Sequence, residues 1–140
     1  MKIKCIKCEP NKNAKIVEME DNLKSWQQAV GGYIEYVYPF QEQPVGVICN
    51  EEGKLENLPF NRPILDDNDS LVDIIAGTCY IVGLDDEGGN RSLTDMEIKL
   101  YEKLWRYPIK VYRWVLKDSS ILGIEPFDEK NGRKVKAYGR

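Results

Sequence analysis

The sequence predicts an α+β protein with a mostly antiparallel sheet, two or three helices packed on one face of it, and a C-terminal β-hairpin extension. Two observations support this. Strand-like segments follow one another across tight turns, which favours antiparallel pairing, and segments with helical spacing lie between them. The 140 residues, 42% hydrophobic and 31% charged, suffice for one globular core. We expect residues 1–108 to form the main unit and residues 109–140 a basic β-hairpin packed on it.

The first elements follow from alternation and capping. Residues 2–8 and 15–20 alternate between apolar and polar and predict two strands. Asp21 is expected to cap a helix. Leu23, Trp26 and Val30 have helical spacing and predict its apolar face. The pair Gly31-Gly32 is expected to end the helix, with one glycine in the left-handed conformation.

The central third predicts more strands and a second helix. Residues 33–40 and 45–50 are expected to pair as antiparallel strands. A turn over residues 50–54 is predicted to use an Asx turn at Asn50 and a positive φ at Gly53. A short helix is expected to begin at Ser70, with a capping box to Asp73, a buried face of Leu71, Ile74 and Ile75, and an end at Gly77.

The last third predicts a buried strand, the longest helix and the terminal hairpin. Residues 78–85 are apolar at nearly every position, as in a strand covered on both faces. Thr94 and Glu97 form a capping box for a helix that Pro108 limits. Leu93 and Ile98 are placed to form a hydrophobic staple at its start, and Glu102 and Arg106 are spaced for an ion pair on its outer face. Its buried face is expected to consist of Ile98, Tyr101, Leu104 and Trp105. Residues 109–117 predict a strand, and Asn131-Gly132 a type I′ hairpin turn.

Composition excludes several classes of function. The chain contains no histidine, which removes histidine-dependent triads and histidine metal sites. No apolar run approaches the roughly 20 residues of a membrane span, and the N-terminus lacks the apolar stretch of a signal peptide. We therefore expect a cytoplasmic protein with no membrane role.

The four cysteines are expected to be buried or half-buried free thiols. Cys5 and Cys8 form a C-x-x-C on a strand, where residues three apart point to opposite faces. Cys49 and Cys79 stand alone in apolar strands, so a second ligand pair for zinc is missing. We expect no metal and no cofactor.

Four motifs resemble a known family. They are VGGYIEYVYPF (30–40), VICNEEGKLENLPFNRPI (47–64), DIIAGTCYIVGLDDE (73–87) and SLTDMEIKLYEK (92–103). Together they resemble the DUF3846 family, a domain of unknown function met in Gram-positive bacteria, their phages and conjugative elements. The resemblance covers roughly residues 1–107; Cys5, Cys8 and the last thirty or so residues lie outside its pattern.

The resemblance implies no reaction. It implies an accessory, mobile-element setting in which small proteins bind host or rival factors. It also marks Asn61, Arg62, the Asn50–Gly53 turn and Gly77 as matching the family's pattern.

Asn61 and Arg62 stand between two prolines inside an apolar run, and two interpretations of them stay open. Arg62 can bridge to nearby aspartates (Asp66, Asp67, Asp69, Asp73) and pin its loop over the sheet. Alternatively, its guanidinium grips an anionic ligand while Asn61 orients it. In the second case we expect the binding surface over residues 50–64, with Glu51 and Lys54 contributing.

The functional expectation is a non-enzymatic binding protein of a phage or mobile element. It would occupy a host or defence protein, or sequester a small anionic ligand such as a signalling nucleotide. One alternative is nucleic-acid binding through the C-terminal strands, because residues 109–140 carry a net charge of +4. The residues expected there are Tyr112, Arg113, Trp114, Arg133, Lys134 and Lys136. A second alternative is a small enzyme that uses carboxylate or cysteine chemistry. Nothing in the sequence indicates an oligomeric state.

Overall fold

The computed structural model describes residues 1–115, 117 and 120–135, and its architecture is the predicted α+β class. The main sheet has the strand order β2-β1-β7-β4-β3, with β8 beside β7, and its neighbouring strands are antiparallel. These strands are β1 (Lys2–Cys8), β2 (Lys15–Glu20), β3 (Ile34–Val37), β4 (Val45–Asn50), β7 (Cys79–Leu84) and β8 (Asn90–Arg91). The residues predicted to form a central strand therefore form β7.

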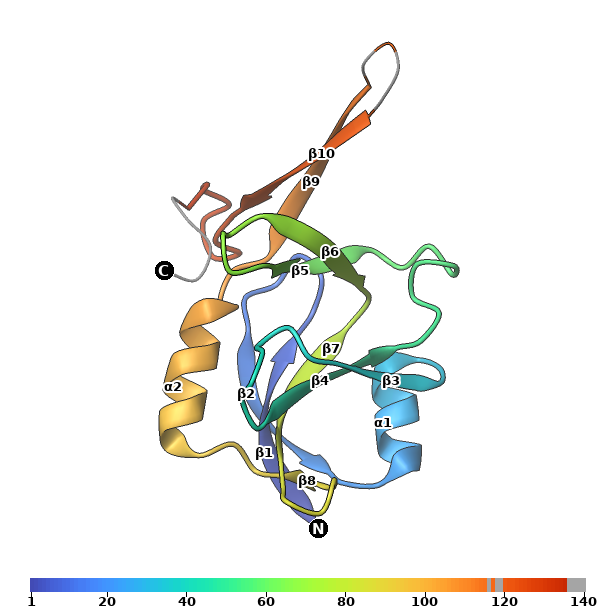
Figure 1. Ribbon diagram of the computed structural model, residues 1–140, viewed down its shortest axis with the longest axis vertical. Helices are drawn as coiled ribbons and strands as arrows, with labels where there is room; N and C mark the ends of the chain where they lie inside the picture. The colour runs from blue at the N-terminus through green and yellow to red at the C-terminus, as the bar shows by residue number, and fades with distance from the viewer. Residues whose placement is uncertain (116, 118–119, 136–140) are drawn as a thin grey trace.

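Two antiparallel strand pairs complete the β-structure. One pair consists of β5 (Phe60–Leu65) and β6 (Leu71–Ala76), which lies over one end of the main sheet (Figure 1). The other consists of β9 (Ile109–Val115) and β10 (Ser120–Pro126), whose far end stands away from the rest of the molecule (Figure 1). β9 contacts β5, so the two pairs adjoin at the base of this hairpin.

The helices α1 (Leu23–Val30) and α2 (Asp95–Leu104) lie on opposite sides of the main sheet (Figure 1). Tyr101 and Trp105 pack with one set of strand residues, and Trp26 and Val30 pack with the other. The expectation of helices on a single face is therefore wrong. Alternate residues of β7 enter the two cores, which explains why this strand is apolar almost throughout.

The predicted helix ends are largely confirmed. The Thr94–Glu97 capping box is present at α2, and Gly31 ends α1 with φ 79°. The N-cap of α1 is Asn22, whose side chain accepts from the Ser25 N–H, and not Asp21. Leu23, expected in the buried stripe of α1, is exposed.

The predicted second helix after Ser70 is wrong, because these residues form β6. Leu71, Ile74 and Ile75 fit either helical or extended spacing over so short a segment. Pairing with β5 decides the outcome, since it satisfies the backbone of the segment along the register from Phe60–Ala76 to Leu65–Leu71.

Two details of the central segments also differ from expectation. Asn50 forms the predicted Asx turn, with its Oδ1 accepting from the Glu52 N–H at 2.8 Å. Gly53 has no positive φ; a Cβ there would lie 2.5 Å from the Ala76 carbonyl oxygen, so close backbone approach requires this glycine. The strand expected over residues 33–40 is confined to β3, which ends before Pro39.

The C-terminal strand pair is present: the predicted strand after Pro108 forms β9, which pairs with β10. The hairpin predicted around Asn131-Gly132 is a separate feature. Only Gly132 of that dipeptide has positive φ, so the turn is not type I′, and the segment forms an isolated bridge between Phe127 and Lys134. Within the described residues, no helix is long and apolar enough to cross a membrane.

Candidate functional site

Asn61 and Arg62, the second and third residues of β5, are both completely buried. The Arg62 guanidinium donates from Nε to the Trp105 carbonyl at 3.0 Å and from Nη2 to the Lys12 carbonyl at 2.8 Å. Its Nη1 donates to Asn61 Oδ1 at 2.7 Å and to the Glu9 carbonyl at 3.3 Å. Trp105 is the C-cap of α2, so the cation also lies at the negative end of a helix dipole.

This geometry agrees with the interpretation in which Arg62 pins its own segment inside the protein, but its partners differ from those expected. The acceptors of Arg62 are backbone carbonyls and the Asn61 amide oxygen, and not the nearby aspartates that the sequence suggested. The guanidinium joins β5 to the β1–β2 turn and to the end of α2. Because neither side chain is exposed, a ligand could reach Asn61 or Arg62 only if the fold opened.

Glu51 and Lys54 lie apart from this buried pair, at a surface cavity of about 220 Å³ between β4 and β6. Lys54 forms an ion pair with Asp73. Glu35 and Glu52 line the same cavity, so acidic groups outnumber the one lysine. The four predicted binding residues are therefore not brought together, and the cavity that holds two of them disfavours an anion.

A different cavity, of about 400 Å³, was not predicted from the sequence. It lies between the β3–β4 loop, the β5–β6 turn and the C-terminal half of α2. Its lining combines aromatic and aliphatic side chains with acidic ones: Pro39, Phe40, Gln41, Gln43, Pro63, Leu65, Asp66, Asp67, Asp69, Leu100, Tyr101, Leu104 and Trp105. We call this the aromatic–acidic cavity.

The apolar floor of the aromatic–acidic cavity is formed by rings in contact. The Phe40 ring centroid lies 4.6 Å from that of Tyr101 and 5.2 Å from that of Trp105. Phe40 thus fixes the β3–β4 loop against α2. Phe40 and the aspartates are distant in sequence, and no local pattern indicated that they meet.

The acidic side of the cavity is held by a tight turn. Asp66 Oδ1 accepts from the backbone N–H groups of Asn68 and Ser70, each at 2.9 Å. This Asx-type arrangement fixes the turn that carries Asp67 and Asp69, both exposed.

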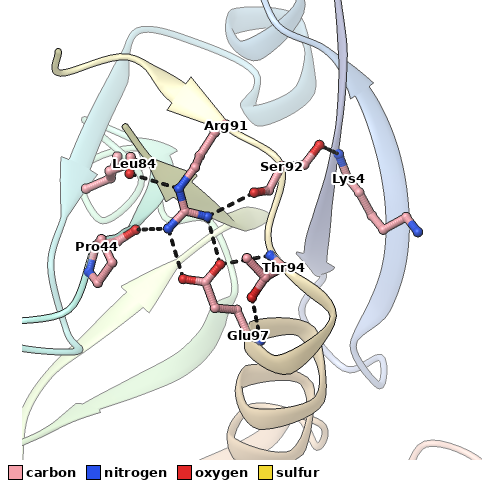
Figure 2. A network of polar contacts seen from close by, with 7 residues as sticks. All are labelled: Lys4, Pro44, Leu84, Arg91, Ser92, Thr94 and Glu97. Carbon is pink, nitrogen blue, oxygen red and sulfur yellow. Dashed lines mark hydrogen bonds and ion pairs between the residues drawn. The ribbon is translucent and has the colours of Figure 1, made fainter. Parts of the chain in front are cut away.

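A polar network around Arg91 joins the end of the β3–β4 loop to the first turn of α2 (Figure 2). Arg91 pairs with both oxygens of Glu97, at 2.7 and 3.0 Å, and donates to the carbonyls of Leu84 and Pro44. Pro44 ends the β3–β4 loop, and Glu97 belongs to the first turn of α2. The hydrogen bonds from Arg91 lower the pKa of Glu97, and the carboxylate raises the pKa of Arg91.

The residues expected to bind nucleic acid are divided between β9 and the segment that follows β10. Tyr112 and Arg113 lie exposed on β9. Arg133 and Lys134 follow β10 near the base of the hairpin, where Lys134 pairs with Glu125 at 3.5 Å. The side chain of Trp114 and all of Lys136 lie outside the described residues.

For the enzyme alternative we expect a deep pocket that contains Glu51, Arg62 or Cys79 with mutual hydrogen-bond geometry, and the structure does not bring Glu51 to the other two. Cys79 and Arg62 are fully buried, whereas Glu51 is exposed at the cavity between β4 and β6. In the described part of the chain, Cys5, Cys8, Cys49 and Cys79 are free thiols. The same part contains no group of three metal-ligating side chains placed to hold an ion.

Comparison with known proteins places the chain in a family. No curated protein and no solved structure matches it. The family model "Domain of unknown function (DUF3846)" matches residues 1–106, which include the buried Asn61–Arg62 pair and the whole lining of the aromatic–acidic cavity. The chain therefore belongs to the DUF3846 family.

Proposed function

We propose that the protein is a non-enzymatic binding protein that occupies another protein by holding a basic segment of it in the aromatic–acidic cavity. The observation that carries this proposal is the cavity itself. Its volume of about 400 Å³ lies in the range of ligand sites, and it combines an apolar floor with three aspartates. A lysine or arginine side chain has an apolar stem and a cationic head, and so matches both parts.

Charge favours a basic partner over the small anionic ligand that the sequence left open. Residues 1–108 carry 12 basic and 19 acidic side chains, a net charge of −7. The cation expected to grip an anion, Arg62, is buried and hydrogen-bonded internally. Sequestration of a signalling nucleotide therefore has weaker support than occupation of a protein.

The cellular setting is part of the proposal. We place the protein in the cytoplasm of a bacterium that carries a phage or mobile element, with a host or defence protein as its partner. The resemblance of the four motifs motivates this setting, and the free thiols among the described residues suit a reducing compartment.

Selection from a library of random nonapeptides tests the proposal. We expect the selected peptides to contain arginine or lysine beside apolar residues. A selected peptide should bind the Asp67→Asn/Asp69→Asn variant at least about tenfold more weakly, because the cavity loses two charges that attract the basic side chain. Calorimetric titration provides the dissociation constants. Asp66 is retained because it holds the turn.

The matched control is the Asp86→Asn/Glu87→Gln variant. These two residues lie on another exposed acidic turn, where Asp85 Oδ1 accepts from the backbone in the same way as Asp66 Oδ1. The control removes the same charge at a distance from the cavity and should leave affinity within about twofold. Equal losses in both variants, or selection of acidic peptides, would refute the cavity as the binding site.

Nucleic-acid binding by the β9–β10 hairpin is the second candidate, favoured by its projection from the body (Figure 1) and by exposed Lys110, Tyr112 and Arg113. Fluorescence anisotropy with a single-stranded oligonucleotide tests it. Binding should weaken steeply from low to physiological salt, because phosphate contacts release counterions. Arg113→Gln should reduce that salt dependence. Binding that is insensitive to both salt and Arg113 would exclude this candidate.

A further inference from the structure

Cys8 and Cys79 face each other across the antiparallel strands β1 and β7. They are direct partners in the register, and both are fully buried. The Cβ atoms of such partners lie about 4.5–5.5 Å apart. A disulfide needs a Cβ separation of about 3.5–4.5 Å. A small approach of the two residues would therefore allow an S–S bond with no change of strand register.

The surroundings of the two sulfurs differ from those of ordinary core thiols. Side-chain interaction with Cys79 lowers the pKa of Cys8, and the Arg62 guanidinium lowers it further, while burial and the charge of Glu102 oppose the shift. The same pairing raises the pKa of Cys79. The two pKa shifts therefore have opposite directions, with Cys8 the more acidic of the two thiols.

Arg62 lowers the pKa of Cys8 because its guanidinium acts as a net positive charge. Among the described ion pairs, no carboxylate neutralises this guanidinium. Its hydrogen-bond acceptors are carbonyl and amide oxygens, which solvate the guanidinium but leave its net charge. Asn61 connects the cation to the thiols, since its Nδ2 donates to Cys8 O at 2.8 Å and lies 3.6 Å from Cys79 Sγ. A buried cation beside two sulfurs stabilises a thiolate.

The other two cysteines lack these features. Cys5 faces Val17 in the register, and Cys49 faces Glu35. Burial raises the pKa of each thiol to about 12. Cys5 packs in the core on the opposite face of the sheet from Cys8, so the two thiols of the C-x-x-C motif do not face each other. The chain therefore contains its own comparison thiols.

We infer that Cys8 and Cys79 form a redox-active dithiol that peroxide converts to an intramolecular disulfide. In the first step, the Cys8 thiolate attacks one oxygen of hydrogen peroxide, the O–O bond breaks, and hydroxide leaves Cys8 as a sulfenic acid. In the second step, the Cys79 sulfur attacks the Cys8 sulfur, the S–O bond breaks, and the departing hydroxyl takes the Cys79 proton as water. Overall, two thiols lose two hydrogens and one peroxide becomes two waters.

Access to the pair depends on its place in the strands. β1 ends at Cys8 and β7 begins at Cys79. The pair therefore lies at the end of this ladder, and access to it requires local opening of the segment that Asn61 holds through the Cys8 and Gly77 carbonyls. Peroxide is small enough to enter through such an opening.

Peroxide treatment of the folded, full chain tests the inference. We expect the intact mass to fall by two hydrogens, and peptide mapping without reductant to link the Cys8 and Cys79 peptides. Dithiothreitol should restore both thiols. Cys5 and Cys49 should be alkylated normally after denaturation, and their oxidation should be at least about tenfold slower than that of the pair.

Variants separate the two steps. Cys79→Ser should leave a Cys8 sulfenic acid that dimedone traps, whereas Cys8→Ser should show neither product. The matched control, Cys5→Ser/Cys49→Ser, should form the disulfide at the wild-type rate, with circular dichroism confirming its fold. The inference is overturned if the control keeps both thiols under peroxide, or if a link in the wild type involves Cys5 or Cys49.

Discussion

Arg62 Nη1 donates to Asn61 Oδ1 at 2.7 Å, and these adjacent side chains lie wholly inside the protein. Successive residues of a strand normally point to opposite faces, but the register of β5 shifts between Phe60 and Arg62. At this irregularity the side-chain amide of Asn61 and the guanidinium of Arg62 lie within hydrogen-bond distance. The pair links β5, the β1–β2 turn and the end of α2, and so acts as an internal tie between three separate segments.

Arg62→Ala is expected to destabilise the protein by about 3 kcal/mol or more. The substitution leaves the buried carbonyl of Trp105 and the part-buried carbonyl of Lys12 without this donor, and each unsatisfied buried group costs about 1–3 kcal/mol. Urea unfolding followed by circular dichroism measures the change. Arg113→Ala, which removes an exposed arginine of β9, should change stability by less than about 0.5 kcal/mol. Similar losses in the two variants would contradict the anchoring role.

Glu97→Gln is expected to lower stability by about 1–2 kcal/mol at neutral pH, because charge-assisted hydrogen bonds to Arg91 are lost. The folded-state pKa of Glu97 lies below its ordinary value of 4.5, so the carboxylate stabilises the fold above that pH. This contribution disappears as the pH falls through the lowered pKa. The difference between wild type and variant should therefore shrink in acid, as urea unfolding at several pH values would show.

Glu102→Gln provides the comparison for Glu97. Glu102 also makes a two-point contact, with Arg106, but this arginine side chain is 43% exposed against 31% for Arg91. We expect a loss of about 0.5 kcal/mol at neutral pH. A loss equal to that of Glu97→Gln would indicate that the lower exposure of the Arg91–Glu97 pair adds no stability.

Asp21→Ala is expected to cost about 1–3 kcal/mol. Asp21 Oδ1 accepts from Trp26 Nε1 at 2.9 Å and from Asn90 Nδ2 at 2.8 Å, and Trp26 is buried. Asp21→Asn keeps an acceptor oxygen and should cost less. Thermal or urea unfolding gives the two values, and tryptophan fluorescence reports the environment of the indole. An asparagine variant as unstable as the alanine variant would show that charge matters more than the acceptor.

Lys54→Met is expected to change stability by less than about 1 kcal/mol, although Lys54 pairs with Asp73. Both side chains are about half exposed, so water competes for the ions and salt screens them. Unfolding in urea at low and high salt checks this expectation. A larger loss that persists at high salt would mean that the cavity beside Lys54 depends on this ion pair.

Several elements were determined by the sequence alone, because their causes are local. β1, β2 and β4 have the predicted bounds, since alternation or apolar runs between turn residues define them. The capping box of α2 was predictable because its hydrogen bonds join residues only three positions apart. The identity of Asn22, and not Asp21, as the N-cap shows the usual limit of such predictions, an uncertainty of one residue at an element's end.

The tertiary structure decided what depends on distant partners. Residues 71–76 are a strand because β5 pairs with them. The same holds for the site. Arg62 is buried because carbonyls from residues 12 and 105 converge on it, and Phe40 meets Tyr101 only when α2 covers the sheet. Hydrogen bonds and ring contacts between residues so far apart in sequence leave no periodic pattern along the chain.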